Sequence, residues 1–512
     1  MQYLIKHIQT YLLGALLCLL ATGCFKDKGN YAYTVPTAVS VDSFGAKAAL
    51  YLDSIIITPT LRAYPDSSIL NDKGRFSYLW TAAIVNRVAT KGDVPLLELS
   101  RERTLRIKLT MRPEKYILYL KVVDVETGNI YYQQTPLTVS TTTNEGWMLL
   151  SDVNNVARLD MVSFLPSPLT DTLVLTDLLK NYGVPELHGP RDISYTIPNQ
   201  GQVLYITGSD GGHKLDGDVF YWQPSYNLKY ECLFDYSANF SPGYVRNSGS
   251  SGSYLLYYGN NYYYQNLVTS SGYGLPVNRV AGETTDFDAS PLIGKAIASS
   301  NPAVLFDRVN KRFLRMNEGA STCAGIPDPD PTKVTVLFSY KPNMDLVYMV
   351  TNQANGITYA ILKDPASSKI FVYSFSITTG SISQNFAKEL TGANIANAEN
   401  FAVSPEFGYL FYSVGSKIYE VDFDNPSVSK LVIDMGSKKI SLMKFHQFRS
   451  YTAAKYATNV KSLLVCSYDT GKPAESCGTL SQYSVPGLFG DPALIKSWSG
   501  FGKIVSLTYR ER

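Results

Sequence analysis

The residue types that most often carry enzyme chemistry are scarce in this chain of 512 residues. Beyond the first 23 residues its histidines are His188, His213 and His446. HExxH, GxSxG and the Walker lysine loop do not occur, so zincin, α/β-hydrolase and P-loop chemistry have no support. A Ser–His–Asp triad assembles in space rather than in sequence, and no pattern here points to one.

Paired carboxylates leave no linear motif, so a glycosidase is the serious enzymatic alternative. Asp286 and Asp288 in TTDFDAS are two residues apart and would share one face of a strand. Asp328 and Asp330 in IPDPDPTK are flanked by prolines, which favour a solvated loop. We interpret neither pair as catalytic.

The densest polar cluster is GSDGGHKLDGD (208–218), in which Asp210, His213, Asp216 and Asp218 lie among glycines. Oxygen ligands on a flexible loop suit Ca²⁺, but the spacing does not reproduce the EF-hand pattern. A long hairpin loop between the strand-like runs QVLYITG and VFYWQ explains the same residues. We therefore predict neither a metal site nor a cofactor.

Aromatic clusters are the best candidates for a ligand-binding surface, because flat rings pack well against sugars and peptide side chains. Five tyrosines flank the turn GNN, and FYWQPSY (220–226) adds two more rings. Consecutive residues on a strand point to opposite faces, so the five tyrosines cannot all face one core. Packing inside the fold is the alternative, and the one we favour. The candidate residues are Tyr257, Tyr258, Tyr262, Tyr263, Tyr264, Trp222 and Tyr226.

Four cysteines lie beyond Cys24: Cys232, Cys323, Cys466 and Cys477. None forms a CxxC pair, which argues against a zinc knuckle or a thioredoxin-type site. Cys466 and Cys477 bracket the turn-like SYDTGKPAES between two strand-like runs. They are candidates for a hairpin disulfide in an oxidising compartment, and two free thiols are the alternative.

The N-terminus has the features of an export signal. A short segment with Lys6 precedes the apolar run YLLGALLCLL, and the small residues ATG stand directly before Cys24. The apolar run is too short to span a bilayer comfortably. The pattern predicts a lipoprotein signal peptide over 1–23, with cleavage before Cys24 and lipid on that cysteine. An ordinary signal peptide is the alternative, since Ala21 stands where a leucine is usual.

The charge balance argues against a nucleic-acid partner. The chain has 46 basic and 43 acidic residues, a formal net charge of +3, and losing Lys6 with the signal peptide leaves +2. Nucleic-acid-binding proteins carry a basic surface that this composition does not supply.

Two regions of strand-like pattern follow the signal. After a polar tether over 24–38, short β-branched and aromatic runs separated by Asp, Gly, Pro and Asn predict a β-sandwich over 39–140, with Trp80 between its sheets. STTTN (140–144) is typical of a linker. From 145 to 512 the strand-like runs recur at longer intervals, anchored on Leu149, Leu204, Leu255, Leu305, Val347, Leu410 and Leu464.

The interval predicts a β-propeller. From Leu149 to Leu464 the spacing averages about 52 residues, which fits propeller blades. We expect about seven blades, and two successive β-sandwiches are the competing architecture. GKIVSLTYR (502–510) and GWMLLSD (146–152) should lie in the same or adjoining blades, closing the ring. We expect Ile504, Ser506 and Thr508 on one face of the last strand and Val505, Leu507 and Tyr509 on the other.

Several of these segments resemble a family of Bacteroidetes lipoproteins described as PKD-like. The resemblance rests on CFKDKGNYAY (24–33), YLW (78–80) and YILYLKVVDVETGNIYY (116–132), and it extends to GWMLLSD. The WDFGDG of archetypal PKD repeats is absent, because Thr81 follows Trp80. Members of this group resemble accessory parts of starch-utilisation-type import systems, in which a TonB-dependent transporter works with companion lipoproteins that capture nutrients.

The fold we predict is all-β: an N-terminal PKD/Ig-like sandwich followed by a propeller of about seven blades. The resemblance implies a non-catalytic, lipid-anchored protein of the outer membrane, exposed at the cell surface and assisting capture of a glycan or peptide beside a TonB-dependent transporter. A propeller-fold carbohydrate-active enzyme is the first alternative. A structural or assembly lipoprotein that binds only protein is the second.

Lipidation can be tested on one residue. A Cys24→Ala variant should lose metabolic acyl label and move from the membrane to the soluble envelope fraction, because one cysteine carries the anchor. Fractionation and labelling of the native and variant proteins measure this. Membrane retention of the variant at the native level would contradict the lipoprotein interpretation.

Overall fold

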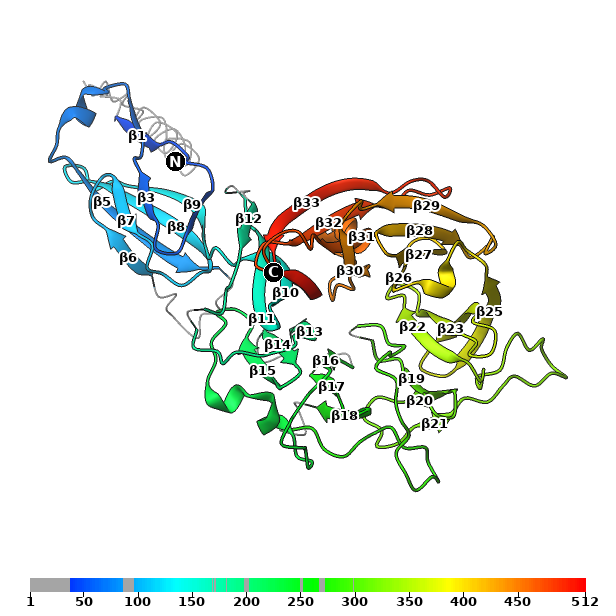
Figure 1. Ribbon diagram of the computed structural model, residues 1–512. Coiled ribbons are helices and arrows are strands. Elements are labelled where there is room, and N and C mark those ends of the chain that lie inside the picture. Colours follow the sequence, from blue (N-terminus) through cyan, green and yellow to red (C-terminus); the bar gives the residue numbers. More distant parts are fainter. Residues whose placement is uncertain are drawn as a thin grey trace, which may run out of the picture. The chain divides into compact units, whose positions relative to one another are not determined.

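The computed structural model describes residues 37–85, 96–167, 169, 172–180, 182–197, 202–248, 252–266, 272–297 and 299–512. These residues form strands joined by turns and a few short helices, in two compact units, one up to Val139 and one from Ser140 (Figure 1). Within the described residues, no helix is both long and apolar enough to cross a bilayer. Cys24 and the predicted signal peptide lie outside the described residues, so lipidation stays a prediction.

The first unit is the predicted β-sandwich. Its larger sheet has the strand order β2 (Lys47–Leu50), β9 (Ile130–Ser140), β8 (Lys115–Asp124), β5 (Phe76–Ile84) and β6 (Leu97–Ser100). The facing layer is made of two antiparallel pairs, β1 (Ala38–Val41) with β4 (Leu61–Tyr64) and β3 (Ser54–Ile57) with β7 (Leu105–Lys108). A 3-10 turn, η1 (Ser68–Asn71), follows β4.

Trp80 fills the space between the two layers, as predicted. Its side chain is fully buried among leucines of β8 and β7, and its indole Nε1 donates to the Glu102 carbonyl oxygen at 3.1 Å. This bond satisfies the one polar atom that the ring would otherwise bury unpaired.

The second unit contains seven sheets, here called blades 1 to 7 in chain order. Blade 1 joins both ends of the unit, and its strands in sheet order are β12 (Thr172–Leu175), β11 (Val156–Phe164), β10 (Glu145–Val153) and β34 (Lys503–Arg510). Blades 2 to 4 have three regular strands each: β13 (Asp192–Thr196), β14 (Val203–Gly208) and β15 (Gly211–Asp216); β16 (Tyr244–Asn247), β17 (Ser253–Tyr258) and β18 (Asn261–Asn266); β19 (Ala303–Asp307), β20 (Arg312–Met316) and β21 (Ala324–Gly325).

Blades 5 to 7 have four strands each: β22 (Asp345–Thr351), β23 (Ile357–Lys363), β24 (Ile370–Ile377) and β25 (Ile382–Leu390); β26 (Asn400–Val403), β27 (Tyr409–Val414), β28 (Lys417–Asp422) and β29 (Ser429–Asp434); β30 (Lys439–Lys444), β31 (Ser462–Tyr468), β32 (Gly478–Ser484) and β33 (Ala493–Phe501). The short helical elements are η2 (Pro224–Tyr226), η3 (Leu228–Glu231), η4 (Ile395–Asn397), η5 (Ala454–Tyr456) and α2 (Ala457–Val460).

Irregular segments complete two of the three-stranded blades. In blade 4 the chain before β19 forms the inner edge, where Gly294 and Val304 exchange two backbone hydrogen bonds of 2.9 Å. In blade 3 the outer edge is residue Val277, whose amide donates to the Tyr262 carbonyl oxygen at 2.8 Å. With these segments included, blades 3 and 4 resemble the four-stranded blades.

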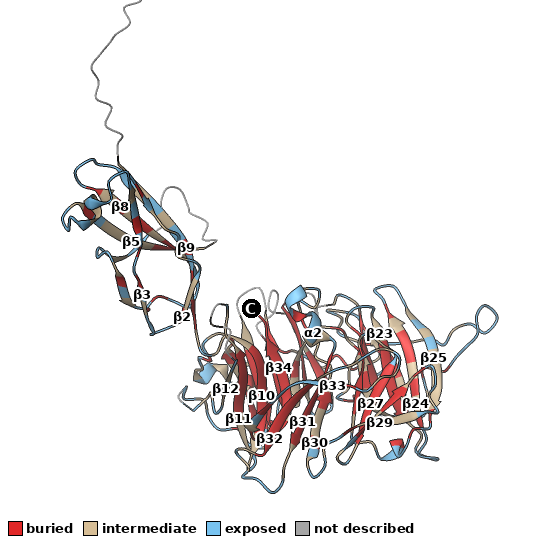
Figure 2. Ribbon diagram, turned by 90° about the horizontal axis from the view of Figure 1, so that it is seen from above, coloured by how far each residue is buried: buried red, intermediate tan, exposed pale blue. Residues whose placement is uncertain are grey.

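Seven buried apolar clusters lie between neighbouring blades, one for each interface of a closed ring of seven. Successive residues of a strand enter the clusters on its two faces: on β10, Leu149 packs against blade 7 and Leu150 against blade 2. Figure 2 shows β10, β31 and β34 buried along most of their length, whereas outer strands such as β25 are only partly buried. The seven predicted anchors fall in seven different blades, which confirms the propeller and excludes two successive sandwiches.

The last strand closes the ring where the sequence predicted it. β34 pairs antiparallel with β10 from Gly146 opposite Arg510 to Asp152 opposite Lys503, and so becomes the innermost strand of blade 1. β10 also pairs with β11 along its whole length. β10 and β11 approach so closely at Gly146 that a Cβ there would lie 1.9 Å from the Val162 carbonyl oxygen.

One detail of the closing strand differs from the prediction. The register of β34 against β10 shifts by one residue between Leu150 and Ser151, which is a β-bulge. Ile504 therefore packs with Leu507 and Tyr509 toward blade 7, while Val505 packs toward blade 2. The predicted strict alternation is wrong before Ser506 because the bulge inserts an extra residue.

The predicted hairpin around Cys466 and Cys477 is present, but both thiols are free. β31 pairs with β32 so that Cys466 lies opposite Leu480, and Cys477 lies beside Asp469, whose amide donates to the Cys477 carbonyl oxygen at 3.0 Å. The cysteines are three positions out of register and project to opposite faces. The disulfide is therefore corrected to two free thiols.

Candidate functional site

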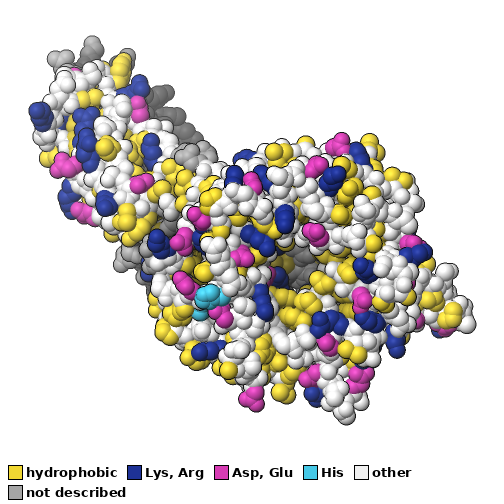
Figure 3. Space-filling model, in the orientation of Figure 1, with side chains coloured by type: hydrophobic (Ala, Val, Ile, Leu, Met, Phe, Trp, Pro, Cys, Tyr) yellow, Lys and Arg dark blue, Asp and Glu magenta, His cyan; other side chains and the backbone are white. Residues whose placement is uncertain are grey.

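The inner strands of the blades surround the axis of the ring (Figure 1). Residues at or just after the C-terminal ends of β13, β16, β30 and β34 line one cavity, so these ends meet at one mouth of the central channel. Figure 3 shows the ring hollowed at its centre. Side chains from blades far apart in sequence meet at this mouth, which makes it the natural place to look for a functional site.

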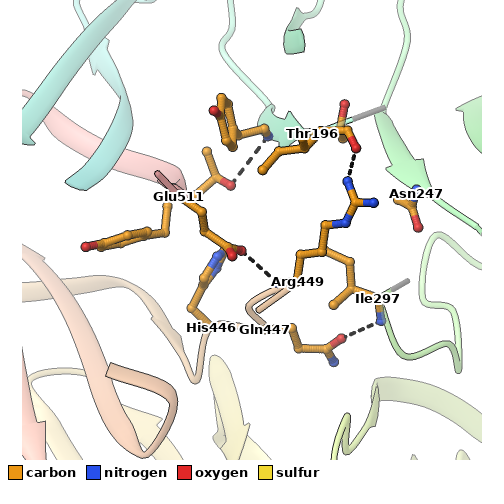
Figure 4. Close-up of a pocket in the computed structure, with 11 residues that line it drawn as sticks. Thr196, Asn247, Ile297, His446, Gln447, Arg449 and Glu511 are labelled. Atoms are coloured by element: carbon orange, nitrogen blue, oxygen red, sulfur yellow. Dashed lines mark hydrogen bonds between the residues drawn. The ribbon is translucent and has the colours of Figure 1, made fainter. Parts of the chain in front are cut away.

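A small cavity of about 40 Å³ lies at the mouth (Figure 4). It is lined by residues of blades 1, 2, 3, 4 and 7: Thr508, Tyr509, Glu511, Tyr195, Thr196, Ile197, Asn247, Ile297, His446, Gln447 and Arg449. A second cavity of about 50 Å³ lies beside it, with Asn352, Gln353 and Ser404 in its wall, and the two share His446 and Gln447. Each has room for a few water molecules only.

The residues between the two cavities belong to the chain after β30, here called the mouth segment (445–451). Its side chains bond across the channel rather than within blade 7. Gln447 Nε2 donates to the Thr351 carbonyl oxygen of blade 5 at 2.7 Å, and Gln447 Oε1 accepts from the amide of Ile297 in blade 4 at 2.9 Å. The Arg449 guanidinium donates to the carbonyl oxygen of Ile197, which follows the inner strand of blade 2.

Backbone groups of the mouth segment are held as well. Glu511, directly after the closing strand, accepts from the amides of Arg449 at 2.7 Å and Ser450 at 3.0 Å. The Gln353 side-chain amide of blade 5 donates to the Phe448 carbonyl oxygen. The mouth segment is therefore tied to four other blades and covers the centre of the mouth.

Below the mouth segment lies a group of partly buried charges. Arg246 makes a bidentate ion pair with Asp192, which also accepts from Ser506 Oγ at 2.9 Å. Lys444 Nζ donates to the Leu507 carbonyl oxygen at 3.0 Å. Burial, aided by the charge of Arg246, lowers the pKa of Lys444 to about 8.

His446 is neutral at pH 7, because burial and the nearby charges of Lys444 and Arg246 hold its pKa well below the ordinary value. Its ring packs edge-on to Trp147 at 5.6 Å and to Phe448 at 4.9 Å. Within the described part of the chain, His446 Nδ1 and Trp147 Nε1 are buried and have no hydrogen-bond partner. The floor of the mouth thus combines neutral aromatic surface with polar atoms that remain free to bond.

The mouth offers hydrogen-bond donors and acceptors from several blades. Among the described residues lining the first cavity, Glu511 is the single carboxylate, and both its oxygens accept backbone amides. Glycoside hydrolysis needs two carboxyl groups flanking the scissile bond. The geometry therefore suits binding of polar groups at the surface of the mouth.

The predicted tyrosine cluster lies elsewhere, on the β17–β18 hairpin of blade 3. Tyr262 and Tyr263 are buried, and they enter the clusters toward blades 4 and 2 respectively. Tyr257 and Tyr264 pack half-buried with Tyr262, and Tyr258 packs with Tyr263. The two-faced arrangement is as expected, but these rings fill the blade interfaces and do not form one open platform.

The other two predicted rings also lie away from the mouth, after β15. Trp222 is half-buried and packs edge-on to His213 at 5.4 Å, and Tyr226 lies edge-on to Tyr221 at 6.0 Å. Lys214 Nζ lies 5.9 Å from the Tyr226 ring centroid. The structure therefore does not bring Trp222 and Tyr226 together with the blade 3 tyrosines into one site.

The acidic residues singled out in the sequence are each engaged separately. Asp286 pairs with Arg279, Asp288 with Arg308, Asp210 with His188 and Asp218 with Arg512. Asp216 caps the amides of Asp218 and Val219, Asp328 accepts the Tyr340 amide and Asp330 accepts from Thr332. GSDGGHKLDGD is not the long loop that the sequence suggested: it forms a tight turn and strand β15, which buries His213. These carboxylates do not converge on a common point.

Sequence patterns did not identify Gln447, Arg449 and Glu511 as site residues. The one available signal was the polar run HQFRS directly after a strand-like segment, which contains one of the few histidines. Their partners come from blades that are close only in the folded ring.

Residues 24–181 match the model of the PKD-like family. The match includes the sandwich and continues through β10, β11 and β12 of blade 1. It confirms the PKD-like resemblance for this part of the chain.

Several solved structures are similar to the chain at low sequence identity. A quinonprotein alcohol dehydrogenase-like protein from Bacteroides thetaiotaomicron is 13% identical, with 91% of this chain and 96% of that chain covered and a TM-score of 0.42. A DUF4784 family protein from Bacteroides caccae is 10% identical, with 92% and 98% covered and a TM-score of 0.29. The β-propeller domain of Cps50 from Myceliophteria thermophila is 10% identical, with 64% and 96% covered and a TM-score of 0.36. No curated protein matches the sequence.

The half-buried Lys444 beside the mouth gives a pH prediction. Because the folded-state pKa of Lys444 is about 8 against 10.5 when exposed, the unfolded chain binds more protons between these values. Unfolding free energy should therefore rise with pH above about 8, by at most about 1.4 kcal/mol per pH unit from this group. Denaturant unfolding of Lys444→Met between pH 8 and 10 should show a smaller rise than the native protein.

Lys417→Met is the matched control, because Lys417 is exposed on β28. Its pH dependence should equal that of the native protein. Part of the rise should remain in Lys444→Met, since burial also lowers the pKa of Lys295 to about 8. An unchanged slope in Lys444→Met would contradict the described environment of Lys444.

Proposed function

We propose that this protein is a non-catalytic, lipid-anchored component of the outer membrane, exposed at the cell surface, that helps to capture a glycan or peptide nutrient beside a TonB-dependent transporter. The anchor is the lipid on Cys24, and residues 24–38 are the tether. The partners are the transporter and its companion lipoproteins. The ligand-binding surface is the mouth of the propeller channel.

Two sequence features support this location and partnership. The lipoprotein-type signal ends at Cys24, and the PKD-like match begins at the same residue. Members of the group that the chain resembles are similar to accessory parts of import systems built from a transporter and surface lipoproteins. These features carry the cellular setting of the proposal, and the mouth of the channel carries its molecular part.

The covered mouth is the observation on which the binding function rests. The mouth segment leaves cavities of about 40 and 50 Å³, whereas sites that enclose a small ligand measure about 300–1,000 Å³. A ligand bound here lies on the surface formed by Gln447, Arg449 and their neighbours. Such a surface suits part of a long chain, glycan or peptide, better than an enclosed substrate.

The same observation weighs against a carbohydrate-active enzyme. Catalysis by paired carboxylates needs a site that shields the reacting bond from water and places two carboxyl groups about 5–10 Å apart. Among the described lining residues, the first cavity has one carboxylate, which is already bonded.

The proposal is tested by purifying the tagged native protein from mildly solubilised membranes and identifying its partners by mass spectrometry. A TonB-dependent transporter should co-purify in near-stoichiometric amount, and deletion of the gene should slow growth on the transported nutrient. A Gln447→Ala, Arg449→Ala double variant should keep the transporter but bind that nutrient about tenfold more weakly.

Lys417→Ala with Lys438→Ala serves as the control, because both lysines lie in blade 6 or just after it, away from the mouth segment. Co-purification without any transporter would contradict the partnership. Release of products from a glycan by the purified protein would favour the enzymatic alternative.

A further inference from the structure

The sandwich has an open strand edge that the propeller proposal leaves unused. β5 is paired along one side with β8, from Phe76 to Ile84. On its other side β6 pairs only with Trp80, Thr81 and Ala82. The first four residues of β5 therefore have no neighbouring strand on that side within the described part of the chain.

Backbone bonds at the two ends of β5 show which groups face the open side. The Val125 amide donates to the Arg75 carbonyl oxygen at 2.8 Å, and the Val85 amide donates to the Lys115 carbonyl oxygen at 2.8 Å. Odd-numbered residues of β5 therefore bond to β8, and even-numbered ones face away, because bonded pairs alternate in antiparallel strands. The amide and carbonyl groups of Phe76 and Tyr78 point to the open edge.

A groove of about 540 Å³ runs along this edge, more than ten times the volume of either cavity at the channel mouth. Leu70 of η1 with Asp72 and Lys73 form one wall, and residues 101–103 form the other. The bond from Trp80 Nε1 to the Glu102 carbonyl oxygen holds the second wall in place. Unpaired edges invite strand addition, and a preformed groove gives an added strand its place.

The groove lining carries more basic than acidic side chains: Lys73, Arg101, Arg103 and Lys121 against Asp72 and Glu102. Lys73, Arg103 and Lys121 lie in it, and within the described residues none of them has an acidic side chain at ion-pair distance. Arg101 is paired with Glu98 at 2.7 Å, so its positive charge is compensated. The Asp72 carboxylate is engaged by the Gly74 amide at 2.9 Å.

We infer that this groove binds an extended acidic segment of a partner protein, which adds to the edge of β5 as an extra strand. The backbone of the segment bonds to the amide and carbonyl groups of Phe76 and Tyr78. Alternate side chains of the segment, Asp or Glu, reach Lys73, Arg103 and Lys121. The inference concerns the sandwich alone and does not depend on the ligand of the channel mouth.

Other occupants fit the groove less well. A second copy of the chain paired edge to edge would bring two basic grooves together, which like-charge repulsion opposes. A glycan has no regular row of N–H and C=O groups to match those of a strand. The combination of a backbone edge and uncompensated positive charge selects an acidic polypeptide.

The test uses the mature chain and a fluorescent eight-residue peptide of alternating Thr and Glu, with capped ends, in an anisotropy titration at low salt. Saturable binding is expected, and it should weaken as salt is added. Two further versions of the peptide carry N-methyl groups, one on the even-numbered amides and one on the odd-numbered amides, so that each loses the hydrogen-bond donors of one edge. The version methylated on the edge that meets β5 should bind about tenfold more weakly or not at all. So should a Thr–Lys peptide.

Protein variants separate backbone from charge. Tyr78→Pro removes the amide N–H that faces the open edge, while Tyr78→Ala keeps it. The proline variant should therefore bind the acidic peptide about tenfold more weakly than the alanine variant. Arg103→Glu with Lys121→Glu should abolish binding. Lys108→Glu with Lys115→Glu makes the same change in net charge at exposed positions of the sandwich outside the groove lining, and should bind at close to native strength.

Circular dichroism and thermal unfolding establish that each variant is folded. Hydrogen exchange supplies a second readout, in which the Tyr78 amide should become protected when the acidic peptide is added. Equal binding of both N-methylated peptides or of the Thr–Lys peptide would overturn the inference. No saturable binding of the acidic peptide up to about 1 mM, or no change in exchange at Tyr78, would overturn it as well.

Discussion

The pairing of the last strand with the first is the interaction on which the propeller depends. β34 and β10 bond from Gly146 to Asp152, so blade 1 is built from both ends of the unit. Without that pairing, blade 1 would lose its inner strand and the apolar cluster between blades 7 and 1 would lose Ile504, Leu507 and Tyr509. Each buried apolar cluster joins a blade only to its neighbour, so this one pairing turns a row of packed blades into a ring.

The candidate ligand site follows from the same closure. Glu511 stands one residue beyond β34 and accepts the amides of Arg449 and Ser450, so the closing strand also anchors the mouth segment. The mouth segment in turn bonds through Gln447 to blades on the far side of the channel. The pairing that closes the ring therefore also positions the mouth segment over the channel. We expect the proposed ligand-binding surface to form only when the ring is closed.

The sequence predicted the features that recur in every blade, but not the local irregularities or the contacts between distant blades. Strand-like runs at regular intervals sufficed for seven blades and their closure, because each blade must bury two faces. The same burial made the tyrosines of blade 3 ambiguous: a ring such as Tyr262 has the same spacing whether it packs against a blade or a ligand. The bulge at Val505, the register around Cys466 and the early end of β6 leave no periodic trace. The contacts of Gln447 and Arg449 join segments that only the fold brings together.

Hydrogen exchange of the native chain, followed by mass spectrometry, tests the closure most directly. Peptides covering 503–510 should be as strongly protected as those covering β31, and should exchange together with 146–153, since both belong to one sheet. β33 provides an internal reference for an outer edge strand, because its first five residues are all exposed. If 503–510 exchanged as fast as the outer edge of β33 and independently of 146–153, the closed-ring account would be contradicted.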